Sequence, residues 1–325
     1  MAHRAMRWLL ACSLGWSAAW VGAEPAIVFD MGGKFDKSFN QAAHQGAERW
    51  KRETGQAYLE FEIANEAQRE QALRRMADKG ASPVIAVGFS QATALEKVAR
   101  EQPQRAFALI DAVVRLPNVE SVVFKEQEGS FLVGMLAALA SKTGQVGFVG
   151  GMDIPLIRKF QCGYEQGARH ANPKVQVRAA MTGTTPAAWS DPTRGAELAR
   201  AQFAQGVDVV FAAAGGTGVG VYQAARDAGK LAIGVDSNQN HLQPGTMLTS
   251  MVKRVDVAVY TLAKKTTPGV TVLGLKEGGV DYALDEHNAK LVTPTMKQKV
   301  DAAKADIVAG RIKVADYMAD GACRY

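Results

Sequence analysis

The feature that most constrains the fold is a regular alternation of short apolar runs with helical patterns. Strands are expected over residues 26–30, 57–63, 83–88, 105–111 and 121–125. Helices are expected over 40–52 and 68–80, which separate the first three of these strands. Strands that alternate with helices are typical of parallel α/β units. The first part of the chain is therefore expected to form a parallel sheet that helices cover.

The same alternation restarts in the second part of the chain. Further strands are expected over residues 145–151, 174–181, 208–214 and 231–236, with helices over 155–171, 192–205 and 217–228. A constant offset of 121 residues also superposes Phe39, Gln45, Gly46 and Ala47 on Phe160, Gln166, Gly167 and Ala168. Because a fixed offset indicates a repeated architecture, we expect two similar lobes.

The first 23 residues differ from the rest. They carry two arginines, no acid, a short apolar middle and small residues up to Ala23, which is the pattern of a secretory signal peptide. No later stretch of about 18 apolar residues could span a membrane. We therefore expect an exported, periplasmic protein that is cleaved after Ala23.

Composition and charge describe an ordinary globular chain. It has 325 residues, of which 47% are hydrophobic and 22% are charged, and its formal net charge is +6. The basic groups at 74–76 and 263–265 are small, whereas a nucleic-acid site needs Lys and Arg clustered along one face. No nucleic-acid partner is expected.

Two cysteines remain after the signal peptide. Cys12 leaves with the leader, and Cys162 and Cys323 stay in an oxidising compartment. The sequence does not give the distance that a bridge requires, so a disulfide and two free thiols both stay open.

Several residues stand where strands end, the edge of a parallel sheet at which ligands bind. These are Asp30, Gly88, Phe89, Asp111, Gly215 and Asp236. Carboxylates there could accept hydrogen bonds from a ligand with N–H or O–H donors. The alternative for each Asp is a helix cap, which has the same sequence pattern.

Aromatic residues in loops suggest a flat ligand. Trp189 is one of two tryptophans outside the leader and lies in a loop, and Phe35 and Phe39 follow the first strand. Rings in such places are explained by stacking, and Phe89 could join them. Phe39 also fits helical spacing and could instead pack inward.

Five motifs in order carry a resemblance over the whole mature chain. They are FDMGGKFDKSFNQAAHQGAE, GQVGFVGGMDIPLIRKFQCGYEQGA, DVVFAAAGGTGVG, GVDSNQN and TSMVKRVDVAVY. This chain resembles the basic membrane protein family of substrate-binding proteins, which includes purine nucleoside receptors. The resemblance implies a type I periplasmic-binding-protein-like fold of two Rossmann-like lobes with a hinge, a cleft for a nucleoside, and delivery to an ABC permease.

The resemblance also places Asp30, Asn40, Asp111, Asp236 and Lys253 at ligand-facing positions. We expect Asp30 and Asn40 to read the edge of the base, and the other three to hold the ribose hydroxyls. Phe35 or Phe39 would stack on the base together with Trp189.

The lobes are expected to exchange chain near residues 125, 252 and 275. One lobe would hold 24–125 and 252–275, and the other 126–251 and 276–325. We expect a monomer that needs no cofactor and no metal, since the histidines lack metal-ligand spacing.

Three alternatives remain. Cys12 follows LLA as in a lipobox but precedes most of the apolar segment, so lipid attachment at Cys12 is the less favoured alternative. A sugar- or signal-binding receptor would share the fold. An exported NAD-dependent enzyme would use the glycines of 215–220 with Asp236, but the G-x-G-x-x-G pattern that starts at Gly216 ends on Val221.

Overall fold

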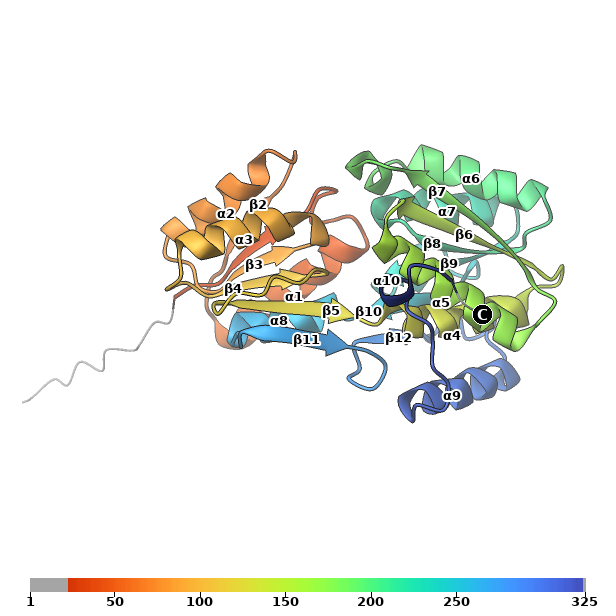
Figure 1. Ribbon diagram of the computed structural model, residues 1–325. Helices are drawn as coiled ribbons and strands as arrows, with labels where there is room; N and C mark the ends of the chain where they lie inside the picture. Colours follow the sequence, from red (N-terminus) through yellow and green to blue (C-terminus); the bar gives the residue numbers. More distant parts are fainter. Residues whose placement is uncertain (1–22, 324–325) are drawn as a thin grey trace, which may run out of the picture.

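The computed structural model describes residues 23–323, which form two α/β lobes side by side (Figure 1). The expected signal peptide, apart from Ala23, and Cys12 lie outside the described residues. Within 23–323, no helix is long and apolar enough to cross a membrane.

The first lobe is built on a six-stranded parallel sheet of order β11-β5-β4-β3-β1-β2. Its strands are β1 (Ala26–Phe29), β2 (Leu59–Glu62), β3 (Val84–Val87), β4 (Phe107–Ile110), β5 (Val119–Phe124) and β11 (Gly269–Leu273). Its helices are α1 (Phe39–Thr54), α2 (Gln68–Asp78), α3 (Ala92–Glu101) and α8 (Val255–Lys264), with the 3₁₀ turn η1 (Phe89–Gln91). Every residue of β1, β3 and β4 is buried, as expected for a sheet covered on both faces.

The second lobe has a six-stranded sheet of order β12-β10-β9-β8-β6-β7, in which β12 alone runs antiparallel to its neighbour. Its strands are β6 (Gln145–Met152), β7 (Gln176–Gly183), β8 (Val209–Ala213), β9 (Leu231–Asp236), β10 (Met247–Lys253) and β12 (Val280–Tyr282). Its helices are α4 (Glu126–Ala140), α5 (Pro155–Ala171), α6 (Pro192–Ala204), α7 (Gly218–Asp227), α9 (Pro294–Val308) and α10 (Tyr317–Asp320). The 3₁₀ turns are η2 (Pro186–Trp189), η3 (Gly215–Thr217) and η4 (Asn240–Leu242).

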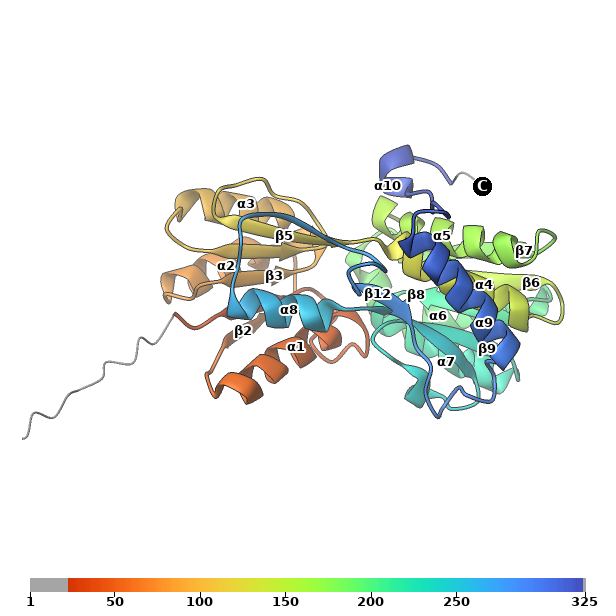
Figure 2. The same cartoon turned by 90° about the horizontal axis from the view of Figure 1, so that it is seen from below.

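The two sheets repeat one strand order. Replacing β1 to β5 by β6 to β10 converts the first order into the second, and β11 and β12 take the same edge. This confirms the expected pair of similar α/β lobes. The helices also pair alike, since α1 packs on α8 as α5 packs on α4 (Figure 2).

The glycines at the repeated offset explain this packing. A Cβ at Gly46 would overlap the backbone of Asp256 in α8, and a Cβ at Gly167 would overlap the backbone of Phe131 in α4. Only a residue without a side chain lets each pair of helices approach so closely.

The structure adds elements that the alternation did not predict. All nine expected strands form, but β10, β11 and β12 complete the sheets, and α4 lies buried between α5 and the sheet. Twelve of the fifteen residues of α4 are buried, so it shows no amphipathic period that would mark a helix in the sequence.

The chain passes between the sheets three times. It crosses at Lys125 after β5, at Arg254 after β10, and over residues 274–279 between β11 and β12. Val252 and Lys253, expected at the start of a first-lobe segment, are the last residues of β10 in the second sheet. The division into two lobes that move as units stays a prediction.

A disulfide joins Cys162 and Cys323 in the structure, with their Cα atoms 5.3 Å apart. Cys162 is a buried residue of α5, and Cys323 follows α10. The bridge therefore fixes the C-terminal segment to the first helix after β6.

Candidate functional site

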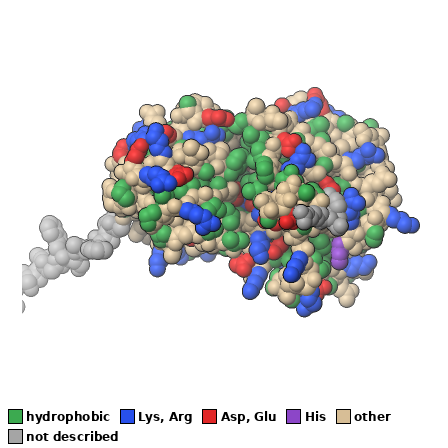
Figure 3. All heavy atoms as spheres, in the orientation of Figure 1, with side chains coloured by type: hydrophobic (Ala, Val, Ile, Leu, Met, Phe, Trp, Pro, Cys, Tyr) green, Lys and Arg blue, Asp and Glu red, His purple; other side chains and the backbone are tan. Residues whose placement is uncertain are grey.

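A cavity lies between the lobes, at the carboxyl ends of the central strands of both sheets. Its empty space is about 620 Å³, a figure that includes open solvent at its mouth. Hydrophobic side chains gather where the lobes meet (Figure 3). Nine of the ten predicted site residues line it: Asp30, Phe39, Asn40, Phe89, Asp111, Trp189, Gly215, Asp236 and Lys253.

Phe35 does not line the cavity. Its side chain is 62% exposed, and its ring meets the ring of His44 edge to face, with centroids 5.3 Å apart. Phe39 is the ring of this loop that faces the cavity, because α1 begins there and turns its side chain toward Lys253.

Two equivalent strand ends supply the central carboxylates. Asp111 follows β4 and Asp236 ends β9, and both have a left-handed backbone, with φ of 73° and 64°. This conformation costs a residue with a Cβ about 1–2 kcal/mol. Strain of this kind collects at functional sites, and here the same turn is kept in both lobes.

Asp236 joins the two lobes. Its Oδ2 accepts a hydrogen bond from Ser38 Oγ at 2.5 Å, and Ser237 Oγ donates to the Ser38 carbonyl at 3.0 Å. Gln239 Nε2 also donates to the carbonyl of Lys37 at 2.8 Å. The loop before α1 is thus tied to the end of β9, and the lobes are closed around the cavity.

Lys253 lies at the deep end of the cavity and is only 2% exposed. Its Nζ is 2.7 Å from Asp111 Oδ2 and 2.9 Å from Glu126 Oε1. The rings of Phe39, Phe124 and Phe160 surround the ammonium, with centroids 5.0 to 5.6 Å away, at cation–π distance.

Burial and these charges set the protonation of the cluster. Burial raises the pKa of Asp236 to about 6, and the Lys253 ammonium offsets only part of the effect. Burial likewise raises the pKa of Asp111. For Lys253 itself, burial disfavours the charge, but Asp111, Glu126 and Asp236 outweigh it and raise the pKa above its usual range.

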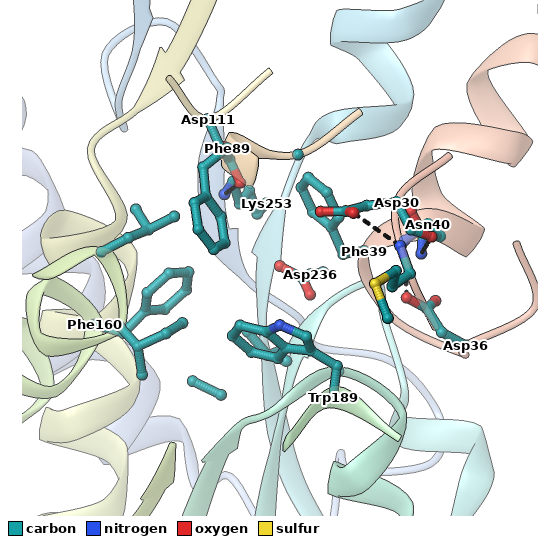
Figure 4. A pocket seen from close by; sticks show the side chains of 17 residues that line it. Asp30, Asp36, Phe39, Asn40, Phe89, Asp111, Phe160, Trp189, Asp236 and Lys253 are labelled. Carbon is teal, nitrogen blue, oxygen red and sulfur yellow. Dashed lines mark hydrogen bonds and ion pairs between the residues drawn. The ribbon is translucent and has the colours of Figure 1, made fainter. Parts of the chain in front are cut away.

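Asp30 and Asn40 lie together at the other end of the cavity (Figure 4). Asn40 Nδ2 donates to the Asp30 carbonyl at 3.1 Å, and its Oδ1 is buried without a partner. Ser90 Oγ donates to Asp30 Oδ2 at 2.6 Å. Gly88 makes room, because a Cβ there would stand 2.6 Å from that oxygen.

Aromatic rings form much of the cavity wall. In Figure 4 the rings of Phe39, Phe89, Phe160 and Trp189 gather around the carboxylate of Asp236. Trp189 lies so close to Gly151 that any Cβ there would overlap its indole. The Trp189 carbonyl and indole also pack on Gly215, whose φ is 57°.

Sequence reasoning missed three functional candidates. Phe160 lines the cavity, and it is the repeat partner of Phe39, so the 121-residue offset already pointed to it. Asp36 lines the cavity while its carboxylate accepts from the backbone of Ser38, Asn40 and Gln41 at the start of α1. Glu126 gave no signal beyond an acid in a first helical turn.

The glycine-rich stretch that suggested a dinucleotide serves packing. A Cβ at Gly220 would overlap the backbone of Pro192, and one at Gly195 would stand 2.5 Å from the Thr217 carbonyl oxygen. These glycines let α6 and α7 approach each other.

Within 23–323, the carboxylates of Asp285 and Glu286 lie with His287 close enough to hold a metal ion, away from the cavity. The Asp285 carboxylate accepts from Asn238 and Asn240, which gives it a structural role.

Two α/β lobes with a cavity at their facing strand ends have the type I fold of periplasmic solute-binding proteins. Sequence comparison identifies the branch: residues 23–317 match the model of the PnrA-like ABC transporter substrate-binding proteins. The chain belongs to this family, which confirms the resemblance to basic membrane proteins. Members bind a small-molecule ligand and work with a permease.

Individual relatives agree with this assignment. The ABC transporter nucleoside-binding protein BmpA of Lactococcus lactis is 33% identical, with 89% of this chain and 88% of that protein covered. An uncharacterised lipoprotein of Pyrococcus furiosus is 38% identical, with 79% of this chain and 69% of that one covered.

Solved structures show the same fold. A solute-binding protein of an ABC transporter system from Aeropyrum pernix superposes with a TM-score of 0.83 at 31% identity, covering 91% of this chain and 94% of that one. The expected type I fold is confirmed.

Proposed function

We propose that this protein binds a purine nucleoside in the cavity between its lobes and delivers it to an ABC permease. The observation that carries the proposal is the make-up of the cavity: it combines flat aromatic walls with a polar group at Asn40 and a charged group at Lys253. A nucleoside has the matching parts, since its base is flat with a hydrogen-bonding edge and its ribose carries hydroxyls. The name of the Lactococcus relative supports the same ligand class.

The base would lie against Phe39 and Trp189, with its edge at Asp30 and Asn40. The buried, unpartnered Oδ1 of Asn40 is an acceptor for an N–H of the base. Phe89 would close the same wall.

The ribose would lie at the charged end. Asp111 Oδ1 is buried without a partner and can accept from a hydroxyl. Asp236 can accept with the oxygen that Ser38 does not use, and Lys253 has three donors, of which one is bonded to Asp111.

We also propose that the protein is exported and that it works as a monomer, which is supported by the fact that one chain supplies both sides of the cavity. Cleavage after Ala23 would release it into the periplasm, whereas two Pyrococcus relatives are named lipoproteins. The mass of the mature protein separates the two: an N-terminus at Glu24 supports release, and a lipid-modified Cys12 would mean a membrane anchor.

Two substitutions test the assignment of base and sugar. Asp236→Ala should weaken the binding of adenosine by about 1.5–3 kcal/mol, which is the typical energy of hydrogen bonds to a charged group. The binding of adenine should be weakened much less. Trp189→Ala should weaken both ligands, by about 1–3 kcal/mol, because stacking acts on the base. Equal losses of both ligands in Asp236→Ala, with Trp189→Ala silent, would mean that the orientation is wrong.

A further inference from the structure

The ammonium of Lys253 is held by a carboxylate that lies outside the cavity. Besides Asp111, its partner is Glu126, the first residue of α4, whose side chain is 1% exposed. Glu126 does not line the cavity. Among the residues that line the cavity, Lys253 is the one with which it forms an ion pair.

A second lysine holds Glu126 from the other side. Lys159 Nζ, on α5, is 3.0 Å from Glu126 Oε2, and it donates to the Phe124 carbonyl at 2.7 Å. Burial alone would raise the pKa of Glu126, but the ammonium groups of Lys253 and Lys159 outweigh it and hold that pKa below its usual range. Glu126 is thus a charged carboxylate between two buried cations.

These charges continue to the C-terminal segment. Lys159 Nζ is 3.6 Å from the carboxylate of Asp316, whose Oδ1 accepts from the Met318 amide at the start of α10. Opposite charges alternate from the cavity through Asp111, Lys253, Glu126 and Lys159 to Asp316. The disulfide of Cys323 fixes the outer end of this series.

The place of Glu126 in the chain matters as much as its contacts. It follows the first crossing between the lobes, and Lys253 precedes the second. Their ion pair therefore joins the two crossing segments at the back of the cavity. A buried ion pair contributes little net stability, so a role beyond simple stability is expected of this one.

We propose that Glu126, held by Lys159, is a positioning residue that fixes the Lys253 ammonium toward the ligand's sugar hydroxyls. This inference rests on the proposed binding of a nucleoside. Lys253 donates a hydrogen bond to Asp111 and forms an ion pair with Glu126, whose carboxylate oxygens accept no hydrogen bond, so donors of the ammonium remain for the ligand. Without Glu126, Lys253 is free to turn toward Asp111 alone or toward Asp236.

The first test is Glu126→Gln, which keeps the shape and removes the charge. Calorimetry with adenosine and with adenine is the measurement. Adenosine should bind about 10- to 100-fold more weakly, the range of a charge-assisted hydrogen bond, while adenine changes by less than about threefold. Equal losses for both ligands, or no loss for adenosine, would overturn the proposal.

A double-mutant cycle with Lys253→Met separates positioning from a structural role. If Glu126 acts through Lys253, adding Glu126→Gln to Lys253→Met should cause no further loss of adenosine affinity. The same loss in both backgrounds would show that Glu126 acts independently, and the proposal would fail.

Asp208→Asn is the matched control for general destabilisation. Asp208 accepts hydrogen bonds from Ser141, Lys142 and Thr143 at the start of β8, the end of the sheet opposite the cavity. It should lower the unfolding temperature and leave adenosine binding unchanged. An adenosine loss in Asp208→Asn as large as in Glu126→Gln would overturn the proposal.

If Glu126→Gln does not fold, Lys159→Gln carries the same test, since it removes the cation that holds Glu126. Lys159→Gln should weaken the binding of adenosine more than that of adenine, and an unchanged adenosine affinity would overturn the proposal. Absence of adenosine binding by the wild type is a different result, because it contradicts the proposed function itself.

Discussion

Ser38 Oγ donates a 2.5 Å hydrogen bond to Asp236 Oδ2 and so connects the first lobe to the second. Both residues are buried, and Asp236 is also a candidate ligand-binding residue. The same carboxylate can therefore close the protein and hold its ligand. Lobe closure and binding are expected to depend on one another at this residue.

Ser38→Ala should weaken the closed state by about 1.5–3 kcal/mol, because it removes a hydrogen bond to a charged group. Small-angle scattering of the ligand-free variant should show a larger radius of gyration than the wild type. Ser237→Ala removes only a bond to the Ser38 carbonyl and should change the radius less. An unchanged radius in Ser38→Ala would show that this bond does not hold the lobes together.

Hinge closure by the ligand follows from the same arrangement, since both lobes line the cavity. Opened Ser38→Ala protein should compact when a tight ligand is added. No compaction at saturating ligand would count against a cleft that closes on its substrate.

Nucleoside binding should depend on pH through Asp236. Its pKa is about 6 without ligand because burial disfavours the charge. An ionised carboxylate accepts hydrogen bonds from hydroxyls more strongly than a protonated one. Adenosine affinity should therefore fall as the pH is lowered from 7.5 to 5, and Asp236→Asn should reduce this dependence to the part that Asp111 contributes. Equal pH dependence in the variant would assign the titration to another group.

The stability of the folded protein should also depend on the pH through Asp236, but it should rise as the pH is lowered, whereas adenosine affinity should fall. A carboxyl whose pKa is raised on folding stabilises the protein below its unfolded pKa, and this contribution is lost as the pH rises through about 6. The unfolding midpoint of the wild type should therefore fall relative to that of Asp236→Asn between pH 4 and pH 7. A constant difference would contradict the raised pKa.

Most residues of the cavity lining could be predicted from the sequence because the repeat brings equivalent strand ends together. Asp111 and Asp236 end equivalent strands, and Phe39 and Phe160 start equivalent helices, so local patterns carried this information. Glu126 and Lys159 could not be found in this way. Their roles depend on where the chain crosses between lobes, and α4 hides its helical period because nearly all of its surface is buried.

Phe35 shows the limit of local reasoning in the other direction. Its position four residues before Phe39 suggested a second stacking ring, but α1 begins at Phe39 and only that ring turns inward. Start points of helices are decided by capping, here by the Asp36 carboxylate, which the sequence marks only weakly.

The disulfide should stabilise the second lobe. Removing it by Cys323→Ser should lower the free energy of unfolding by about 2–4 kcal/mol, because it closes a long loop. Titration of the unfolded, unreduced protein should find no free thiol in the mature chain. Two free thiols per chain would show that Cys162 and Cys323 are not bonded.

The most direct measurement is calorimetry of the wild-type protein with adenosine, adenine, ribose and glucose. Adenosine should bind most tightly, since it alone contacts both the aromatic walls and the charged groups around Lys253. Adenine should bind more weakly and the free sugars weakest. Tight binding of a sugar, with no measurable heat from adenosine, would contradict nucleoside binding and make this protein a sugar receptor.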